Sequence, residues 1–183
     1  MAEKEAKIFI VDLGVSMRNR NNGRVETDLD WSLRYFWDKI SDIVSLNRKT
    51  ICVGVVGLRT DETSNLMEDD EGYEHISVLR QLSGPMDFPG MKVLQKLIKP
   101  SNEVTGDAIS AIALSIRMIL DFTKKLKYKR EITLITDGLG FMDIDEEDVQ
   151  AIADQLNVSE ISLKVLYVLF AGVRLGMYGT DIL

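Results

Sequence analysis

Short apolar runs alternate along this chain with longer segments of helical hydrophobic period, and this alternation strongly constrains the fold. Four of the runs are rich in β-branched residues and cover residues 7–12, 50–56, 131–136 and 161–170. Continuous apolar runs of this length are typical of strands that are covered on both faces. A fifth run, residues 73–82, alternates apolar and polar side chains, which is typical of an edge or antiparallel strand.

The segments between these runs have the apolar spacing of amphipathic helices. We predict helices at residues 29–44, with Thr27 as the N-cap, at 90–98, at 106–126 and at 145–156. Strands and helices in this order predict an α/β domain with a mostly parallel sheet, one antiparallel edge strand and helices on both faces. Such a domain has three layers and is Rossmann-like.

Size and composition narrow the class of protein. The 183 residues suffice for one domain with a real core, and the net charge of −7 argues against wrapping nucleic acid alone. Cys52, the single cysteine, is expected to be a buried small hydrophobe without a disulfide partner in the chain. We expect no signal peptide and no membrane span, because no apolar stretch is long enough. These features favour a reducing compartment, the cytosol or nucleus.

Polar residues follow two of the predicted parallel strands, at the sheet edge where α/β domains bind ligands. Asp12 and Ser16 lie on the turn after the first strand, Asp137 follows a later strand, and Thr105 precedes the longest helix. Carboxylate and hydroxyl oxygens suit Mg²⁺, so these four residues are the candidate metal ligands. Gly14 stands where a further hydroxyl ligand would be needed, so the set is incomplete.

The alternative assigns the same residues to local structure. Asp12 and Asp137 would accept hydrogen bonds from backbone amides in their own turns, and Thr105 would cap the long helix. The missing hydroxyl favours this interpretation, so we expect no cofactor, although a Mg²⁺ ion stays open.

Signals for catalysis are weak in this chain. His75, the only histidine, lies in the predicted edge strand without a recognisable serine or cysteine partner motif. The chain contains no Gly-x-x-x-x-Gly-Lys-Ser/Thr loop for a nucleotide phosphate. The basic cluster 124–130 suits a helix C-terminus, and a small contribution to a DNA-binding surface stays open. The acidic helix start at 145–148 fits a solvated face or a second docking face.

Three segments carry a resemblance to a known family. Residues 12–17, the stretch 72–82 that follows an acidic loop, and residues 132–137 occur in the order seen in Ku. Over residues 5–170 the chain resembles the amino-terminal von Willebrand factor A-like domain of the larger Ku subunit, in a fungal form. The strand-end turn with Asp12 is similar to a degenerate metal-ion-dependent adhesion site. The domain is expected at residues 1–171, without its last helix and strand, followed by an irregular segment at 172–183.

The resemblance implies a function in DNA repair and at telomeres. Ku is a heterodimer of a larger and a smaller subunit that threads onto double-stranded DNA ends and starts non-homologous end joining. Fungal Ku also protects telomeres and supports silencing, which implies a location in the nucleus and at chromosome ends. Most DNA contact belongs to a central β-barrel, so this domain is expected to bind little DNA by itself. Family members are often labelled ATP-dependent DNA helicases, but no motif here supports an enzyme.

The resemblance also implies a docking site for short linear peptides of repair or telomere-silencing proteins. Such peptides carry basic and aromatic or apolar anchors. By local correspondence, the groove would be formed by Met67, Tyr73, Asp107, Ala113 and Ile116. An apolar floor would hold an anchor side chain, and carboxylates would attract the basic part. The helical stripe equally allows Ile116 to be a core residue.

Two functions other than peptide binding are alternatives for this chain. A metal-dependent A domain would capture an acidic protein ligand through an ion at the strand ends. A phosphate-using α/β enzyme would need a phosphate loop or a catalytic dyad, and the sequence shows neither.

Overall fold

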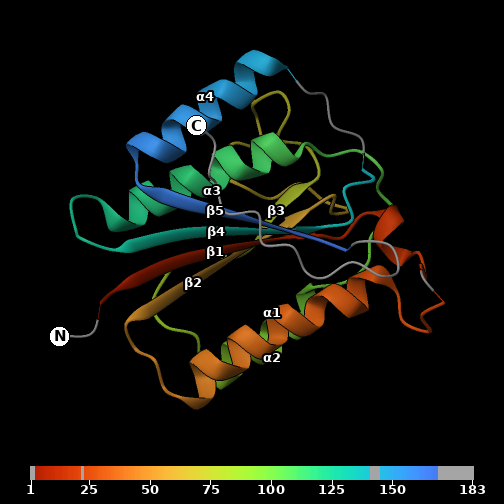
Figure 1. Ribbon diagram of the computed structural model, residues 1–183, viewed down its shortest axis with the longest axis horizontal. Coiled ribbons are helices and arrows are strands. Elements are labelled where there is room, and N and C mark those ends of the chain that lie inside the picture. The colour runs from red at the N-terminus through yellow and green to blue at the C-terminus, as the bar shows by residue number, and fades with distance from the viewer. Residues whose placement is uncertain (1–2, 22, 141–144, 169–183) are drawn as a thin grey trace.

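The computed structural model describes residues 3–21, 23–140 and 145–168 (Figure 1). Five strands form one sheet in the order β3-β2-β1-β4-β5. These strands are β1 (Glu5–Asp12), β2 (Ile51–Leu58), β3 (Ile76–Arg80), β4 (Lys129–Thr136) and β5 (Ile161–Tyr167). The helices are η1 (Val15–Arg18, a 3₁₀ helix), α1 (Asp28–Ser45), α2 (Phe88–Leu97), α3 (Ala108–Thr123) and α4 (Glu146–Val158). Strands β1, β2, β4 and β5 are parallel and β3 is antiparallel to β2, which confirms the predicted sheet.

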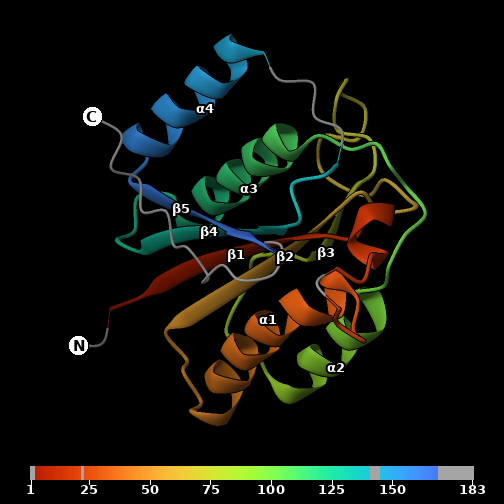
Figure 2. The same cartoon turned by 45° about the vertical axis from the view of Figure 1, so that its right-hand side comes forward.

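Helices cover both faces of the sheet. Helices α3 and α4 lie on one face, and α1 and α2 lie on the other (Figures 1 and 2). Successive residues of β1 serve the two faces in turn: Ile8 and Ile10 join the core that includes α3, and Phe9 and Val11 join the core that includes α1. Because side chains alternate along a strand, burial on both sides explains why this run is apolar throughout.

Two of the predicted strands are shorter in the structure. The run at 73–82 forms a strand only over Ile76–Arg80, because His75 has a left-handed backbone with φ of 57° directly before it. The run at 161–170 forms β5 only as far as Tyr167, and residues 169–170 lie outside the described residues. The predicted irregular segment at 172–183 also lies outside them.

The helices begin at polar caps that the sequence partly predicts. The Thr27 side chain accepts a hydrogen bond from the backbone N–H of Asp30 and caps α1, as predicted. Helix α3 is shorter than the predicted 106–126, because it begins after Asp107 and ends before Lys124, whose φ is 47°. Thr105 does not cap this helix, since Asp107 accepts from the backbone N–H of Ser110.

Cys52 is buried on β2 and free, as its apolar surroundings in the sequence predict. Burial raises the pKa of its thiol, so the side chain behaves as a neutral hydrophobe. Within the described ranges, none of the helices combines the length and the apolar character that crossing a bilayer requires.

The parallel strands bring distant turns to one edge of the sheet. β1 lies between β2 and β4, with Asp12 paired to Leu58 and Val11 paired to Ile135. The chain therefore leaves all three strands at the same level. The turns that follow Asp12, Leu58 and Thr136 meet there, although long stretches of sequence separate them.

Candidate functional site

Asp12 is the centre of this edge. It ends β1 with an exposed fraction of 0%, and both of its carboxylate oxygens accept hydrogen bonds. The Oδ1 atom accepts from the backbone N–H of Gly14 at 3.1 Å. The Oδ2 atom accepts from the Thr136 hydroxyl at 2.6 Å and from Nη1 of Arg59 at 2.5 Å. Protein donors thus surround the carboxylate, and a buried guanidinium balances its charge.

Arg59 directly follows β2 and is 2% exposed. Its backbone has a φ of 57°, and its carbonyl accepts a hydrogen bond from the Ser101 hydroxyl at 2.5 Å. Glycines leave the room for its side chain. An ideal Cβ would lie 2.7 Å from Cδ of Arg59 if added at Gly14, 3.0 Å from Cγ at Gly106 and 1.8 Å from Cζ at Gly140.

In the described part of the chain, the hydrogen-bond partners of the Asp12 carboxylate do not include Ser16, Thr105 or Asp137. Asp137 accepts from the backbone N–H of Leu139 at 2.9 Å, and Thr105 is exposed. Ser16 lies in η1 and is half-buried. The local interpretation is therefore confirmed for Asp12 and Asp137, each of which accepts from an amide in its own turn.

These residues do not fit a divalent ion. Mg²⁺ takes about six oxygen ligands, but both oxygens of Asp12 already have protein donors and Arg59 places a positive charge beside them. Among the described residues, no group of three or more acidic, histidine or cysteine side chains is arranged to hold a metal.

The residues of the expected peptide groove fall into two groups. Met67 and Tyr73 are half-buried and pack against the core that includes α3. Asn65 connects them, because its side chain accepts from the backbone N–H of Met67 at 2.8 Å and donates to the Tyr73 carbonyl at 3.2 Å. The sequence reasoning missed Asn65, whose only signal is that an asparagine often bonds backbone two residues on.

Asp107 lies close to Tyr73 at the start of α3. Its Oδ2 atom accepts from the backbone N–H of Ser110 at 2.6 Å and from the Ser110 hydroxyl at 2.8 Å. Its Oδ1 atom is buried and has no hydrogen-bond partner within the described part of the chain. Burial, together with the charges of Asp70 and Asp107, raises the pKa of Tyr73. Tyr73 therefore lies near enough to Asp107 to be affected by its charge.

Ala113 and Ile116 lie further along α3. Ala113 is half-buried, but Ile116 is 0% exposed and belongs to the core. The alternative in which Ile116 is a core residue describes this structure, so Ile116 offers no surface to a peptide here. The hydrophobic stripe of a helix that packs on a sheet explains its position.

A protein-family model, described as the Ku70/Ku80 N-terminal alpha/beta domain, matches residues 6–171. The chain belongs to this Ku family. It is 48% identical over 183 residues to "ATP-dependent DNA helicase II subunit 2" of Neurospora crassa, which covers 99% of this chain and 25% of that protein. The protein of the same name from Chaetomium globosum is also 48% identical, with 99% of this chain and 24% of that protein covered. The chain thus spans about a quarter of the length of these relatives.

A solved structure confirms the expected fold class of this Ku domain. The VWA domain of SpRpn10 superimposes with a TM-score of 0.65 at 12% sequence identity, over 90% of this chain and 75% of that one. At this identity the likeness concerns the fold alone. The Ku domain therefore has the fold of a von Willebrand A domain.

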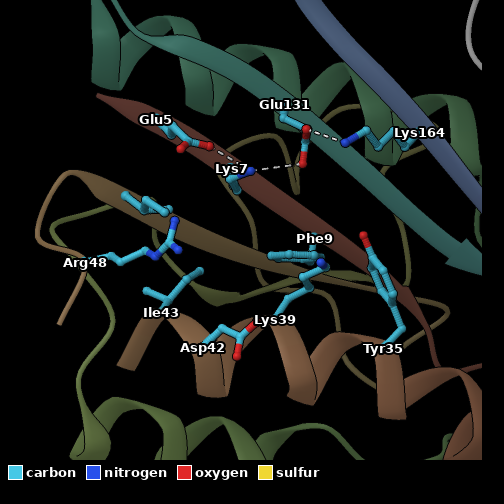
Figure 3. Close-up of a pocket in the computed structure, with 11 residues that line it drawn as sticks. Glu5, Lys7, Phe9, Tyr35, Lys39, Asp42, Ile43, Arg48, Glu131 and Lys164 are labelled. Carbon is cyan, nitrogen blue, oxygen red and sulfur yellow. Dashed lines mark hydrogen bonds and ion pairs between the residues drawn. The ribbon is translucent and has the colours of Figure 1, made fainter. Parts of the chain in front are cut away.

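The Ku domain has a second charged cluster, at the other end of β1, that the sequence reasoning missed. It lines a cavity of about 260 Å³ between the sheet and α1 (Figure 3). Glu131 of β4 accepts from Lys164 of β5 at 2.6 Å and from Lys7 of β1 at 3.3 Å. Lys7 also pairs with Glu5 at 2.9 Å. The parallel register pairs Lys7 with Glu131, and Lys164 lies two residues beyond Ser162, the β5 residue that pairs with Glu131.

The two central groups of this cluster hold their charges firmly. Burial acts to raise the pKa of Glu131, but the hydrogen bond from Lys164 and the charges of Lys7 and Lys164 outweigh it, so the pKa is lowered. Burial acts to lower the pKa of Lys7, and the hydrogen bonds and charges of Glu5 and Glu131 outweigh it, so that pKa is raised.

Proposed function

We propose that this domain is a docking module of a Ku DNA-end-binding complex that recruits peptide motifs for non-homologous end joining. In this proposal it has no enzymatic activity, works in the nucleus and at chromosome ends, and also serves telomere maintenance or silencing. The longer protein pairs with the smaller Ku subunit and meets double-stranded DNA ends through that complex. Membership of the Ku family and the names of the fungal relatives support the proposal.

The observation that supports the docking function best is that Tyr73 lies near Asp107 at the start of α3. The loop that bears Tyr73 contacts the start of α3, since a Cβ at Gly72 would lie 3.4 Å from the Ser110 hydroxyl. One side of this junction is the half-buried tyrosine, and the other is a carboxylate with one oxygen that lacks a partner among the described residues. An apolar or aromatic anchor suits the first, and a basic group suits the second.

The charge around this junction favours a basic peptide. Residues 61–74 contain seven carboxylates and no lysine or arginine. Leu66, in the same loop, is 68% exposed and adds apolar surface. Complementary charge raises the rate of encounter with a basic ligand, while the buried anchor supplies most of the affinity.

The test uses the full-length subunit purified with the smaller Ku subunit. The probe is a fluorescein-labelled synthetic peptide with a pair of arginines followed by tryptophan and leucine, and binding is followed by fluorescence polarisation. Tyr73→Ala and Asp107→Asn are each expected to weaken binding by about tenfold, which corresponds to about 1.4 kcal/mol. Asparagine still caps a helix, so the second variant removes the charge and keeps α3.

Asp145→Asn is the matched control, because it makes the same change at the N-cap of α4. It is expected to bind the peptide like the wild type. A peptide in which glutamates replace the arginines should not bind. Wild-type affinity in both Tyr73→Ala and Asp107→Asn would contradict the assignment of the docking site.

A further inference from the structure

We propose that the guanidinium of Arg59 is the resident cation of the strand-end site. It occupies the position that a divalent ion would need beside Asp12, so the site is filled by the chain itself. In this role Arg59 is a positioning residue: it neutralises Asp12 and joins the turns that surround it. The proposal concerns the free domain and does not depend on peptide binding.

The charge balance supports this role. Asp12 is completely buried, and the Arg59 side chain is 3% exposed. A carboxylate in such a place requires a positive partner, because water cannot stabilise its charge. Nη1 of Arg59 supplies that charge at 2.5 Å from Oδ2, while Thr136 and Gly14 supply neutral donors. An anion with three protein donors, one of them cationic, needs no further ion.

The shape of the site is specific for a long side chain that enters from the end of β2. Any side chain at Gly140 would overlap the guanidinium, and one at Gly14 would overlap the methylene groups that lead to it. Both glycines come from turns that are far from Arg59 in the sequence. A small spherical ion would not require a cleared path of this length.

Arg59 also fixes the segments on either side of it. Its carbonyl accepts from the Ser101 hydroxyl, and Thr60, the next residue, donates its backbone N–H to the His75 carbonyl at 2.9 Å. Gly106 lies against the Arg59 backbone, with an ideal Cβ at 3.3 Å from its nitrogen. Arg59 and Thr60 together link the ends of β1 and β2 to the loops before β3 and α3.

The test is a charge-compensation cycle on the 183-residue chain, followed by thermal unfolding. Arg59→Met keeps the length of the side chain and removes its charge, so Asp12 is left buried without a cation. Its melting temperature is expected to fall by about 8 °C or more. Adding Asp12→Asn to Arg59→Met removes the stranded charge and should recover at least half of that loss. A double variant no more stable than Arg59→Met would overturn the proposal, even where the single variant fails to fold.

Cations in solution provide the second readout. Melting of the wild type is expected to be the same in EDTA and in about 5 mM MgCl₂ or MnCl₂, because a ligand that does not bind cannot stabilise. Arg59→Ala opens the cleared path, and methylguanidinium at about 10 mM should raise its melting temperature above that in methylammonium. Arg18→Ala is the control, because Arg18 is exposed and its side chain bonds Asn102 and Pro100 rather than Asp12. A wild type that EDTA destabilises would also overturn the proposal.

Discussion

The two ends of β1 carry acid–base clusters of similar composition and very different burial. At the carboxyl end, the side chains of Asp12 and Arg59 are 0% and 3% exposed. At the amino end, those of Lys7 and Lys164 are 20% and 38% exposed around Glu131 (Figure 3). Water can solvate the second cluster if one partner is lost, but it cannot reach the first. Loss of one partner of an ion pair is therefore expected to cost more stability at the carboxyl end of β1 than at the amino end.

The largest difference in stability is expected when the central carboxylate of each cluster is replaced by its amide. Asp12→Asn removes the carboxylate that pairs with the buried guanidinium of Arg59, and should cost about 3–5 kcal/mol of unfolding free energy. Glu131→Gln leaves two lysines that can turn to water, and should cost about 1 kcal/mol. Denaturant unfolding of both variants measures the comparison. Equal losses would show that burial does not separate the two clusters.

A smaller effect should come from the glycines that surround Arg59. Gly140→Ala places a methyl group at 1.8 Å from Cζ of Arg59, so the guanidinium must move away from Asp12. The expected cost is about 2 kcal/mol, in the range of overpacked cores. Gly84→Ala is the control, since an ideal Cβ there has no neighbour within 4 Å. If both variants unfold at the same denaturant concentration, the close fit around Arg59 has no energetic consequence.

Acid should weaken the amino-end cluster. The pKa of Glu131 is lower in the folded state than its ordinary value of 4.5, so the folded state favours the charged form. Its stabilisation is fully present above pH 4.5 and is lost as the pH falls through the lower folded value. The stability difference between wild type and Glu131→Gln should therefore shrink below pH 4.5. A difference that stays constant or grows in acid would show that Glu131 is not stabilised as a carboxylate.

The sequence predicts more of the fold than of the candidate site. Continuous apolar runs identify the strands that are covered on both faces, because the apolar side chains of β1 and β2 each belong to one of the two cores. The limits of β3 could not be predicted in this way. The left-handed turn at His75 depends on hydrogen bonds to Thr60 and Thr63, which come from another part of the chain.

Arg59 had no signal in a local pattern. A charged residue after a strand is typical of a solvated turn, and only the folded sheet shows that it points at Asp12. The sequence feature most closely related to Arg59 is a set of glycines in three separate turns, at 14, 106 and 140, which leave room for its side chain. These are more than 30 residues apart in the chain, so their common purpose becomes visible only when the sheet brings them together. The sequence predicts candidate metal ligands at the carboxyl edge of the sheet, but it does not predict that the Arg59 side chain lies beside Asp12 there.

The smallest effect is expected from salt, which should reduce the stability loss of a variant in the exposed cluster but not that of a variant in the buried cluster. Lys164→Met removes a partly exposed partner of Glu131, and should cost about 0.5 kcal/mol at low ionic strength. Raising NaCl to about 1 M shortens the screening length to about 3 Å and should remove most of that difference. The loss in Arg59→Met should persist at the same salt concentration, because ions do not enter a sealed pair. Equal screening of both losses would mean that solvent reaches Asp12, and that the two ends of β1 differ less than their exposure indicates.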